Sequence, residues 1–185
     1  MVTGQPRGFP TPTRKVEIYS TRFVRGGYAP LPVYQEPGER PHSRPDLAQQ
    51  YPLVLTFFRL VQYCDVQYRN IPRLRRQVPE PFLEIHPATA AAGRIQDGEW
   101  VILETATGRI RLKARYKDAL HPGVVTTAHG WWQGCQELGL PGYDPFGPEG
   151  ANANLLVSND VIDPISGSVP YRSQRCRVRK EGVPA

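Results

Sequence analysis

Residues 82–116 read FLEIHPATAAAGRIQDGEWVILETATGRIRLKARY and decide the fold. The apolar segment 82–85 predicts a strand. Pro87 suits the first turn of a helix, and the alanines after it favour one helical turn that ends at Gly93. The pair Asp97-Gly98 then predicts a tight turn with positive φ at the glycine.

Two alternating segments complete this stretch as a hairpin. Residues 100–105 carry apolar side chains on both faces, whereas residues 110–116 alternate apolar with basic side chains. The pair Thr107-Gly108 turns the chain between them. The order of strand, helical turn and hairpin indicates the centre of a small β-barrel.

Composition favours a β-rich protein with a long irregular lead-in. The chain of 185 residues holds 20 prolines and 17 glycines, which predicts many turns and little long helix. Apolar residues concentrate after Tyr51, so the core is expected there. Residues 15–20 alternate as a short edge strand would, and residues 26–52 form an extended proline-rich segment. We therefore predict an extended N-terminal arm over residues 1–50 and a barrel domain over residues 51–185.

The flanking segments supply the remaining strands of the predicted barrel. Residues 53–58 are a near-continuous apolar run, typical of a strand buried on both faces, and residues 124–128 form another short strand. The last strand spans residues 175–179, with basic side chains facing outward. Residues 59–70 keep no clean period, and their pattern leaves a loop and a half-buried surface helix equally open. Residues 139–150 predict a long loop, which in a compact domain is functional or disordered.

Charge and cysteine content restrict the class of protein. Lys and Arg exceed Asp and Glu by 23 to 17, giving a net charge of +6, which favours an anionic partner or simply keeps the domain soluble. The three cysteines show neither zinc spacing nor a disulfide pattern. We find no stretch of membrane-spanning length and no signal peptide, so we expect this chain in the cytoplasm, although an assembled enzyme could be periplasmic.

The usual catalytic motifs are absent from the sequence. It holds no Gly-rich nucleotide loop and no Gly-x-Ser-x-Gly motif, and its four histidines lie in separate turns. We therefore expect neither catalytic residues nor metal ligands in this chain. It is predicted to bind a ligand rather than to carry complete catalytic machinery.

From Thr13 onward, a series of short motifs resembles the C-terminal portion of the dimethyl sulfoxide reductase and formate dehydrogenase family of molybdopterin oxidoreductases, with its molybdopterin dinucleotide-binding domain. Their order and spacing over about 170 residues carry the resemblance. The motifs are TRKVEIYS (13–20), YPLVLT (51–56), IHP (85–87), GEWV (98–101), HPGVV (121–125), HGWW (129–132), NANLL (152–156), DPISG (163–167) and YR (171–172).

The resemblance implies a mainly β fold, a double-psi β-barrel of about six strands with short helices. In whole family members this domain caps a larger catalytic body and helps to hold molybdopterin guanine dinucleotide, whose dithiolenes bind molybdenum or tungsten. The metal ligand lies in earlier domains, so the expected partner is the catalytic remainder or large subunit. The resemblance begins inside the family's alignment, and we accordingly expect a fragment, a split gene product or a separate subunit.

The same resemblance assigns candidate cofactor-binding residues. The loop after the first barrel strand is expected to pass along the pterin and diphosphate, with Arg59 as the charge partner. The HGWW motif matches a cofactor-facing loop, and Tyr171-Arg172 lies near the pterin, where the family often has Lys in place of Arg172. Asn152 equally suits a helix cap. The candidates are Thr56, Arg59, Gln62, Tyr63, Cys64, His129, Gly130, Trp131, Asn152, Asn154, Tyr171 and Arg172.

Two other functional classes compete with a cofactor-binding domain. A stand-alone double-psi barrel could act as a protein-interaction module, but such a module would not need the pterin-loop residues. Nucleic-acid binding through basic charge would need a recognisable motif or a regular stripe of Arg and aromatic residues, which the sequence lacks. We therefore predict a partner enzyme, with no nucleic acid and no direct membrane insertion.

Overall fold

The structure is a computed structural model that describes residues 8–34, 36, 42–147, 150–160 and 162–182. The chain divides into two compact units, residues 1–36 and residues 37–185. The first unit contains the short helix α1 (Thr21–Arg25), whose first turn is capped by the Ser20 hydroxyl accepting from the Phe23 amide. Within the described residues no helix is both long and apolar enough to span a membrane.

The strand predicted over residues 15–20 is wrong. No strand forms there, and the side chains of Val16, Ile18 and Tyr19 are exposed. Glu17 instead accepts hydrogen bonds from the amide and hydroxyl of Thr13. An alternating segment becomes a strand only when a neighbouring strand satisfies its backbone groups, and the first unit supplies none in its described part.

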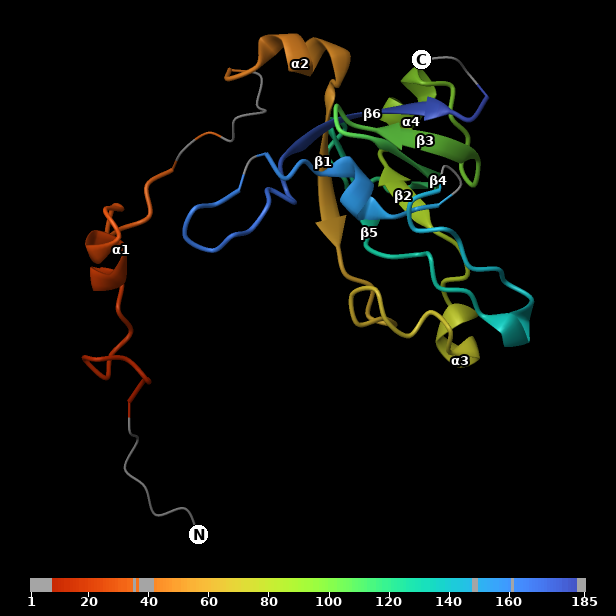
Figure 1. Cartoon of the computed structure of the whole chain (residues 1–185). Helices are drawn as coiled ribbons and strands as arrows, with labels where there is room; N and C mark the ends of the chain where they lie inside the picture. The colour runs from red at the N-terminus through yellow and green to blue at the C-terminus, as the bar shows by residue number, and fades with distance from the viewer. Residues whose placement is uncertain (1–7, 35, 37–41, 148–149, 161, 183–185) are drawn as a thin grey trace. The chain divides into compact units, whose positions relative to one another are not determined.

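The second unit is built on a closed barrel of six strands (Figure 1). Their order around the barrel is β1-β5-β2-β4-β3-β6; β1 pairs with β5 and β2 with β4 in parallel, and the other neighbours are antiparallel. The predicted barrel with short helices is confirmed. The strands are β1 (Leu53–Phe58), β2 (Phe82–Ile85), β3 (Trp100–Glu104), β4 (Arg109–Tyr116), β5 (Val124–Ala128) and β6 (Gln174–Lys180).

Short helices lie in the segments that connect or flank the barrel strands (Figure 1). Pro begins α2, α3 and α4, where its missing amide costs no helical hydrogen bond. The helices are α2 (Pro45–Gln50), α3 (Pro72–Arg75), α4 (Pro87–Ala92) and the 3₁₀ turns η1 (Gln136–Leu138) and η2 (Ala153–Leu156).

The central stretch folds as the sequence predicts, with one difference at the end of α4. Gly98 has φ +77° in the turn before β3, as expected. Gly93, however, has φ −85°, and the left-handed residue that follows the helix is Arg94, with φ +53°. The helix thus ends at Ala92 with Gly93 as its cap, as predicted, but the left-handed residue after it is Arg94 instead of the glycine.

Alternation along the strands directs one side-chain row into the barrel. In β3 and β4 the inward residues are buried and their neighbours are half-buried or exposed, as period-two alternation requires. The interior row of these strands and β1 consists of Leu55, Val101, Leu103, Ile110, Leu112 and Ala114.

Burial in β1 and β6 differs from the prediction. Only Leu55 is buried in β1. The other five side chains are half-buried, so this strand is not enclosed on both faces as predicted. In β6 the guanidinium-bearing Arg175 is only 6% exposed instead of facing outward, since the first three residues of this strand are all buried. The interpretation of residues 59–70 as a surface helix is also wrong: they form turns, with positive φ at Asp65 and Tyr68.

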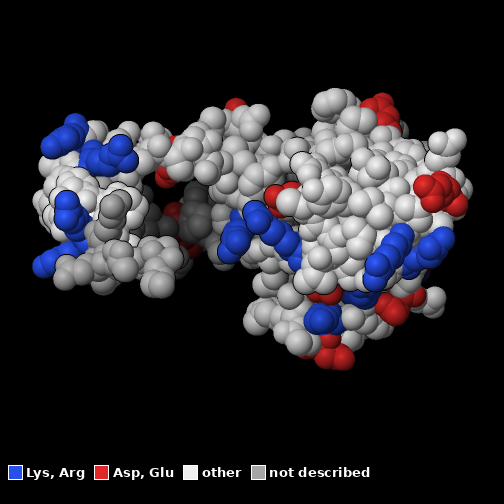
Figure 2. Space-filling model, turned by 90° about the horizontal axis from the view of Figure 1, so that it is seen from below, with Lys and Arg blue, Asp and Glu red and all other residues white. Residues whose placement is uncertain are grey.

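Most cations on the barrel wall pair with carboxylates. Arg111 pairs with Glu181 at 2.6 Å and Lys113 with Glu80 at 2.6 Å. On the face seen in Figure 2, Lys and Arg lie in separate groups with acidic side chains among them. This face therefore presents no continuous basic stripe of the kind that tracks a nucleic-acid backbone.

Candidate functional site

The parallel pairing of β1 with β5 brings two distant loops together. Val54 to Phe58 lie beside Val124 to Ala128 in register, so both strands end at the same edge of the barrel. The segment after β1 and the segment after β5 consequently leave the barrel side by side (Figure 1). The Arg69 amide donates to the Gln133 side chain at 3.0 Å and ties the two segments together.

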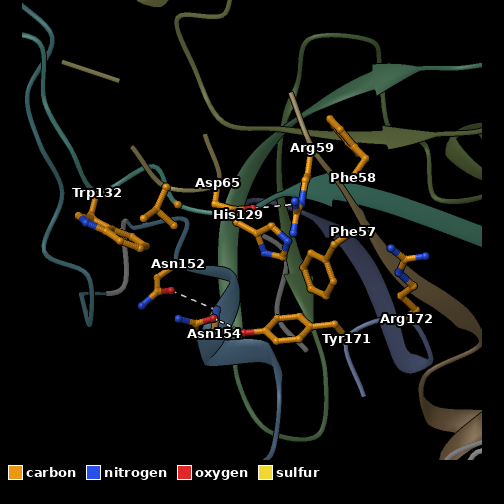
Figure 3. A pocket seen from close by; sticks show the side chains of 12 residues that line it. Phe57, Phe58, Arg59, Asp65, His129, Trp132, Asn152, Asn154, Tyr171 and Arg172 are labelled. Atoms are coloured by element: carbon orange, nitrogen blue, oxygen red, sulfur yellow. Dashed lines mark hydrogen bonds and ion pairs between the residues drawn. The ribbon is translucent and has the colours of Figure 1, made fainter. Parts of the chain in front are cut away.

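A pocket of about 460 Å³ lies where these loops meet η2 and the segment before β6 (Figure 3). Its volume lies within the range of small-molecule sites, roughly 300–1,000 Å³. Four separate parts of the sequence supply its wall. The lining residues are Phe57, Phe58, Arg59, Asp65, Val66, His129, Gly130, Trp132, Asn152, Asn154, Tyr171 and Arg172.

Three rings form one wall of the pocket (Figure 3). The His129 ring stacks on Phe57, with centroids 5.1 Å apart and planes inclined by 19°. Tyr171 meets both rings edge-on, at 5.3 Å from Phe57 and 5.5 Å from His129. The Tyr171 hydroxyl donates to the Asn154 side chain, which fixes the phenol ring. This wall is suited to contact a flat heterocycle.

Two arginines give the pocket positive charge. Arg59 Nε lies 3.1 Å from a carboxylate oxygen of Asp65, and both side chains are open to solvent. Arg172 is exposed and forms no ion pair within the described ranges. Guanidinium groups in such positions bind phosphate oxygens with charge-assisted hydrogen bonds.

The titrating rings of the wall are neutral at pH 7. Burial lowers the pKa of His129 below its ordinary value; the Arg59 and Arg69 charges act in the same direction and the Asp65 charge opposes them. Burial raises the pKa of Tyr171. At neutral pH the wall therefore offers an uncharged imidazole and a protonated phenol, both able to form neutral hydrogen bonds.

The two asparagines of η2 have different tasks. Asn152 is buried; its side-chain oxygen accepts from the Asn154 amide at 3.1 Å and its NH₂ group donates to the Pro145 carbonyl at 3.0 Å. Asn152 thus caps the 3₁₀ turn and holds the preceding loop, as its residue type suggests. Asn154 is exposed and presents its amide beside Tyr171.

Backbone strain gathers beside the pocket. Gly130 has φ +86° and Trp131, a residue with a large side chain, has φ +89°. An ideal Cβ on Gly130 would lie 2.8 Å from Arg69 Nη1 and 3.2 Å from the Val66 Cα atom. Only glycine fits this close approach of the HGWW loop to the loop after β1.

Seven of the twelve candidates predicted from the sequence line the pocket, and the other five do not. Tyr63 is buried and donates its hydroxyl to the Val78 carbonyl at 2.9 Å, and Trp131 is fully buried in the core. Gln62 bonds Gln77, Cys64 is exposed, and Thr56 lies in β1 beside β5. The seven that line the pocket are Arg59, His129, Gly130, Asn152, Asn154, Tyr171 and Arg172.

Sequence reasoning missed five residues of the wall. Phe57 and Phe58 end an apolar run and therefore suggested core packing, while Trp132, although part of the HGWW motif, was not among the candidates. Their position in the sequence could have identified Phe57 and Phe58, because side chains at the carboxyl end of a strand lie at the edge of the barrel. Asp65 and Val66 gave no signal, since the turn that directs them has positive φ at Asp65.

The chain is similar to a known domain family and to several individual proteins. The profile of the molydopterin dinucleotide binding domain matches residues 53–175. Acetylene hydratase of Syntrophotalea acetylenica is 36% identical over 157 residues, which are 84% of this chain and 20% of that protein. Dopamine dehydroxylase of Eggerthella lenta is 33% identical over 180 residues, covering 94% of this chain and 17% of that protein.

The structural comparison agrees with these matches. The solved acetylene hydratase from Pelobacter acetylenicus superposes with a TM-score of 0.77 at 33% identity, covering 94% of this chain and 24% of that chain. Dimethyl sulfoxide reductase DmsA of Escherichia coli is 30% identical over 183 residues. The chain spans about a fifth of the length of the curated relatives it matches.

Proposed function

The chain belongs to the molydopterin dinucleotide binding domain family, and we propose that its barrel helps to hold molybdopterin guanine dinucleotide in a molybdenum or tungsten oxidoreductase. The supporting observation is that polar and aromatic side chains from distant parts of the sequence lie together. Two guanidinium groups, three rings and an exposed amide, drawn from four separate segments, meet in one pocket at the edge of the barrel.

The residues of the pocket fit the chemistry of this cofactor. A pterin is a flat heterocycle with polar edges, which the wall of Phe57, His129 and Tyr171 can contact while Asn154 offers an amide to its edge. A pyrophosphate requires cations, and Arg59 and Arg172 supply them.

The cofactor, when bound, supplies the redox-active metal centre, and this chain supplies binding and orientation. We propose that Arg59 exchanges its Asp65 contact for the diphosphate. The neutral His129 and Tyr171 hold the pterin without adding charge, because burial disfavours the charged form of each. Among the described residues no three His, Cys, Asp or Glu side chains gather to form a metal site. We propose that other parts of the enzyme ligate the metal.

We further propose that the partner is the catalytic remainder of such an enzyme. The relatives are named a hydratase, a dehydroxylase and a reductase, and each shares this segment as about a fifth of its length. A segment common to proteins named for different reactions serves what they have in common, which we take to be the cofactor. The choice of substrate would then lie outside this chain.

Co-purification tests this proposal. The tagged chain is recovered from its native host, and the eluate is assayed for molybdenum and tungsten and, after oxidation, for pterin fluorescence. We expect metal and pterin in the parental eluate and a clear loss of both in Arg59→Ala and Arg172→Ala, with unchanged thermal unfolding because both side chains are exposed. Arg76→Ala is the matched control, since Arg76 is exposed and does not line this pocket. Undiminished metal and pterin in both pocket variants would refute the assignment of these arginines.

A further inference from the structure

We propose that Arg69 is the positioning residue of the pocket: its buried guanidinium joins the loop after β1 to the HGWW loop and sets the distance between them. This inference rests on the proposed function and deepens it, because the two loops that Arg69 joins carry six of the twelve lining residues. Arg69 itself touches no ligand in this proposal, since it is 1% exposed and does not line the pocket.

The hydrogen bonds of Arg69 link two lining residues from different loops. Its Nη1 donates to the Asp65 carbonyl at 2.8 Å, and its Nη2 donates to the His129 carbonyl. Asp65 follows β1 and His129 follows β5. One rigid fork therefore bonds lining residues of both loops.

Aromatic rings hold the same guanidinium in place. Its central carbon lies 4.5 Å from the centroid of Tyr63 and 4.6 Å from that of Trp131. These are the two sequence candidates that are buried beneath the pocket instead of lining it. Their position near the site follows from contact with Arg69, and the close approach of Gly130 to Nη1 completes the enclosure.

This layer contains features that oppose stability. Neither Arg69 nor the equally buried Arg75 forms an ion pair with a carboxylate in the described part of the chain. Burial lowers the pKa of Arg69 to about 10, so it remains charged at neutral pH. Trp131 combines positive φ with an Nε1 atom that is buried without an acceptor among the described residues. Buried charges without ion pairs, positive φ and an unbonded polar atom that occur together are typical of a functional site.

Arg75 provides the matched comparison. It is also 1% exposed, also lies over Trp131, at 5.3 Å, and also donates to carbonyls, those of Pro79, Gln133 and, at 3.5 Å, Arg69. None of these carbonyls belongs to a residue that lines the pocket. Loss of either guanidinium removes a buried cation and a link between the two segments, but only the Arg69 guanidinium bonds the carbonyls of lining residues, Asp65 and His129.

The experiment compares Arg69→Met, Arg75→Met and the parental 185-residue chain. Affinity is measured with pterin-6-carboxylate by fluorescence, and the pKa of His129 is measured by NMR, with His129→Gln to assign its signal. We expect Arg69→Met to weaken binding about tenfold, as it would if one molecule in ten kept the binding-competent loop arrangement. The pKa of His129 should rise in the same variant, because the Arg69 charge helps to depress it. Arg75→Met should unfold more easily but retain parental affinity and the parental His129 pKa.

Equal loss of affinity in both variants would show that Arg69 has only a structural role and would overturn the inference. The inference would also be overturned if Arg69→Met kept both the parental affinity and the parental His129 pKa. If the parental chain alone does not bind pterin-6-carboxylate, the proposed pterin contact fails, while amide hydrogen exchange in the two loops, faster in Arg69→Met than in Arg75→Met, still decides the inference. Should Arg69→Met not fold, Arg69→Lys replaces it. A single ammonium retains the charge but cannot reach both carbonyls as a fork, so we expect a near-parental His129 pKa with weakened binding, and parental affinity would refute the proposal.

Discussion

Gly130 offers a direct test of how closely the two pocket loops approach each other. Gly98 and Gly130 have similar backbone angles, φ +77° and φ +86°. They differ in their surroundings: a Cβ on Gly98 would meet no atom within 4 Å, whereas a Cβ on Gly130 would lie 2.8 Å from Arg69 Nη1. Replacing each glycine with Ala therefore separates backbone strain from steric crowding.

The expected magnitudes follow from these two costs. Left-handed backbone costs an alanine about 1–2 kcal/mol, and the reduced freedom of the unfolded chain returns about 0.4–1 kcal/mol. Gly98→Ala should thus lose about 1 kcal/mol of unfolding free energy. Gly130→Ala adds overpacking of about 1–3 kcal/mol, because Arg69 is buried and bonded and cannot retreat, which brings its loss to about 3 kcal/mol.

Thermal unfolding followed by near-ultraviolet circular dichroism measures the difference. For a domain of this size about 1 kcal/mol corresponds to roughly 2–4 °C in Tm. We expect a decrease of about 2–4 °C for Gly98→Ala and about 6–12 °C for Gly130→Ala. Gly130→Ala should also weaken pterin binding, since it displaces Arg69, while Gly98→Ala should not. A loss for Gly130→Ala no larger than that for Gly98→Ala would refute the close approach.

Two further predictions concern the barrel itself. The hydrogen bond and charge of Arg177, 3.1 Å from Glu104, lower the pKa of that carboxyl group, so this stabilisation is present above about pH 4.3 and lost as the pH falls. Glu104→Gln should therefore flatten the acid side of the stability curve in urea titrations at several pH values; an unchanged acid slope would contradict the pairing. Iodoacetamide should modify exposed Cys64 in the native chain but reach buried Cys135 and Cys176 only after denaturation, as mass spectrometry would reveal; native labelling of a buried thiol would argue against this core.

Local pattern predicted the strands and turns of the barrel but not how the strands pair. The alternation of residues 110–116 and the Asp97-Gly98 turn are local signals, and both are confirmed. Residues 15–20 show the same alternation and form no strand, because the hydrogen bonds of a strand depend on a neighbour distant in sequence. The parallel pairing of β1 with β5, which creates the pocket, is likewise a long-range property.

The site was predictable where residues follow a strand end and unpredictable inside irregular loops. His129 follows directly on β5, so its place at the barrel edge follows from the strand alone. The loop after β1 consists of turns without a regular period, so spacing could not distinguish Arg59, which lines the pocket, from Tyr63, which is buried and bonds the Val78 carbonyl. Nothing in the sequence indicated that Arg69 is buried, because its burial depends on hydrogen bonds to carbonyls of both loops.

The circular order of the strands determines when the molecule can finish folding. β6 is the last strand in the chain, yet it joins β1 and β3, pairing Leu53 with Cys176 across almost the whole barrel sequence. A nascent chain emerging from the ribosome therefore carries two unpaired strand edges until β6 appears, and such edges invite aggregation. Tyr171 and Arg172 directly precede β6, so the last residues of the pocket arrive with the strand that closes the barrel. Closure of the fold and completion of the ligand site thus belong to a single late event in biosynthesis.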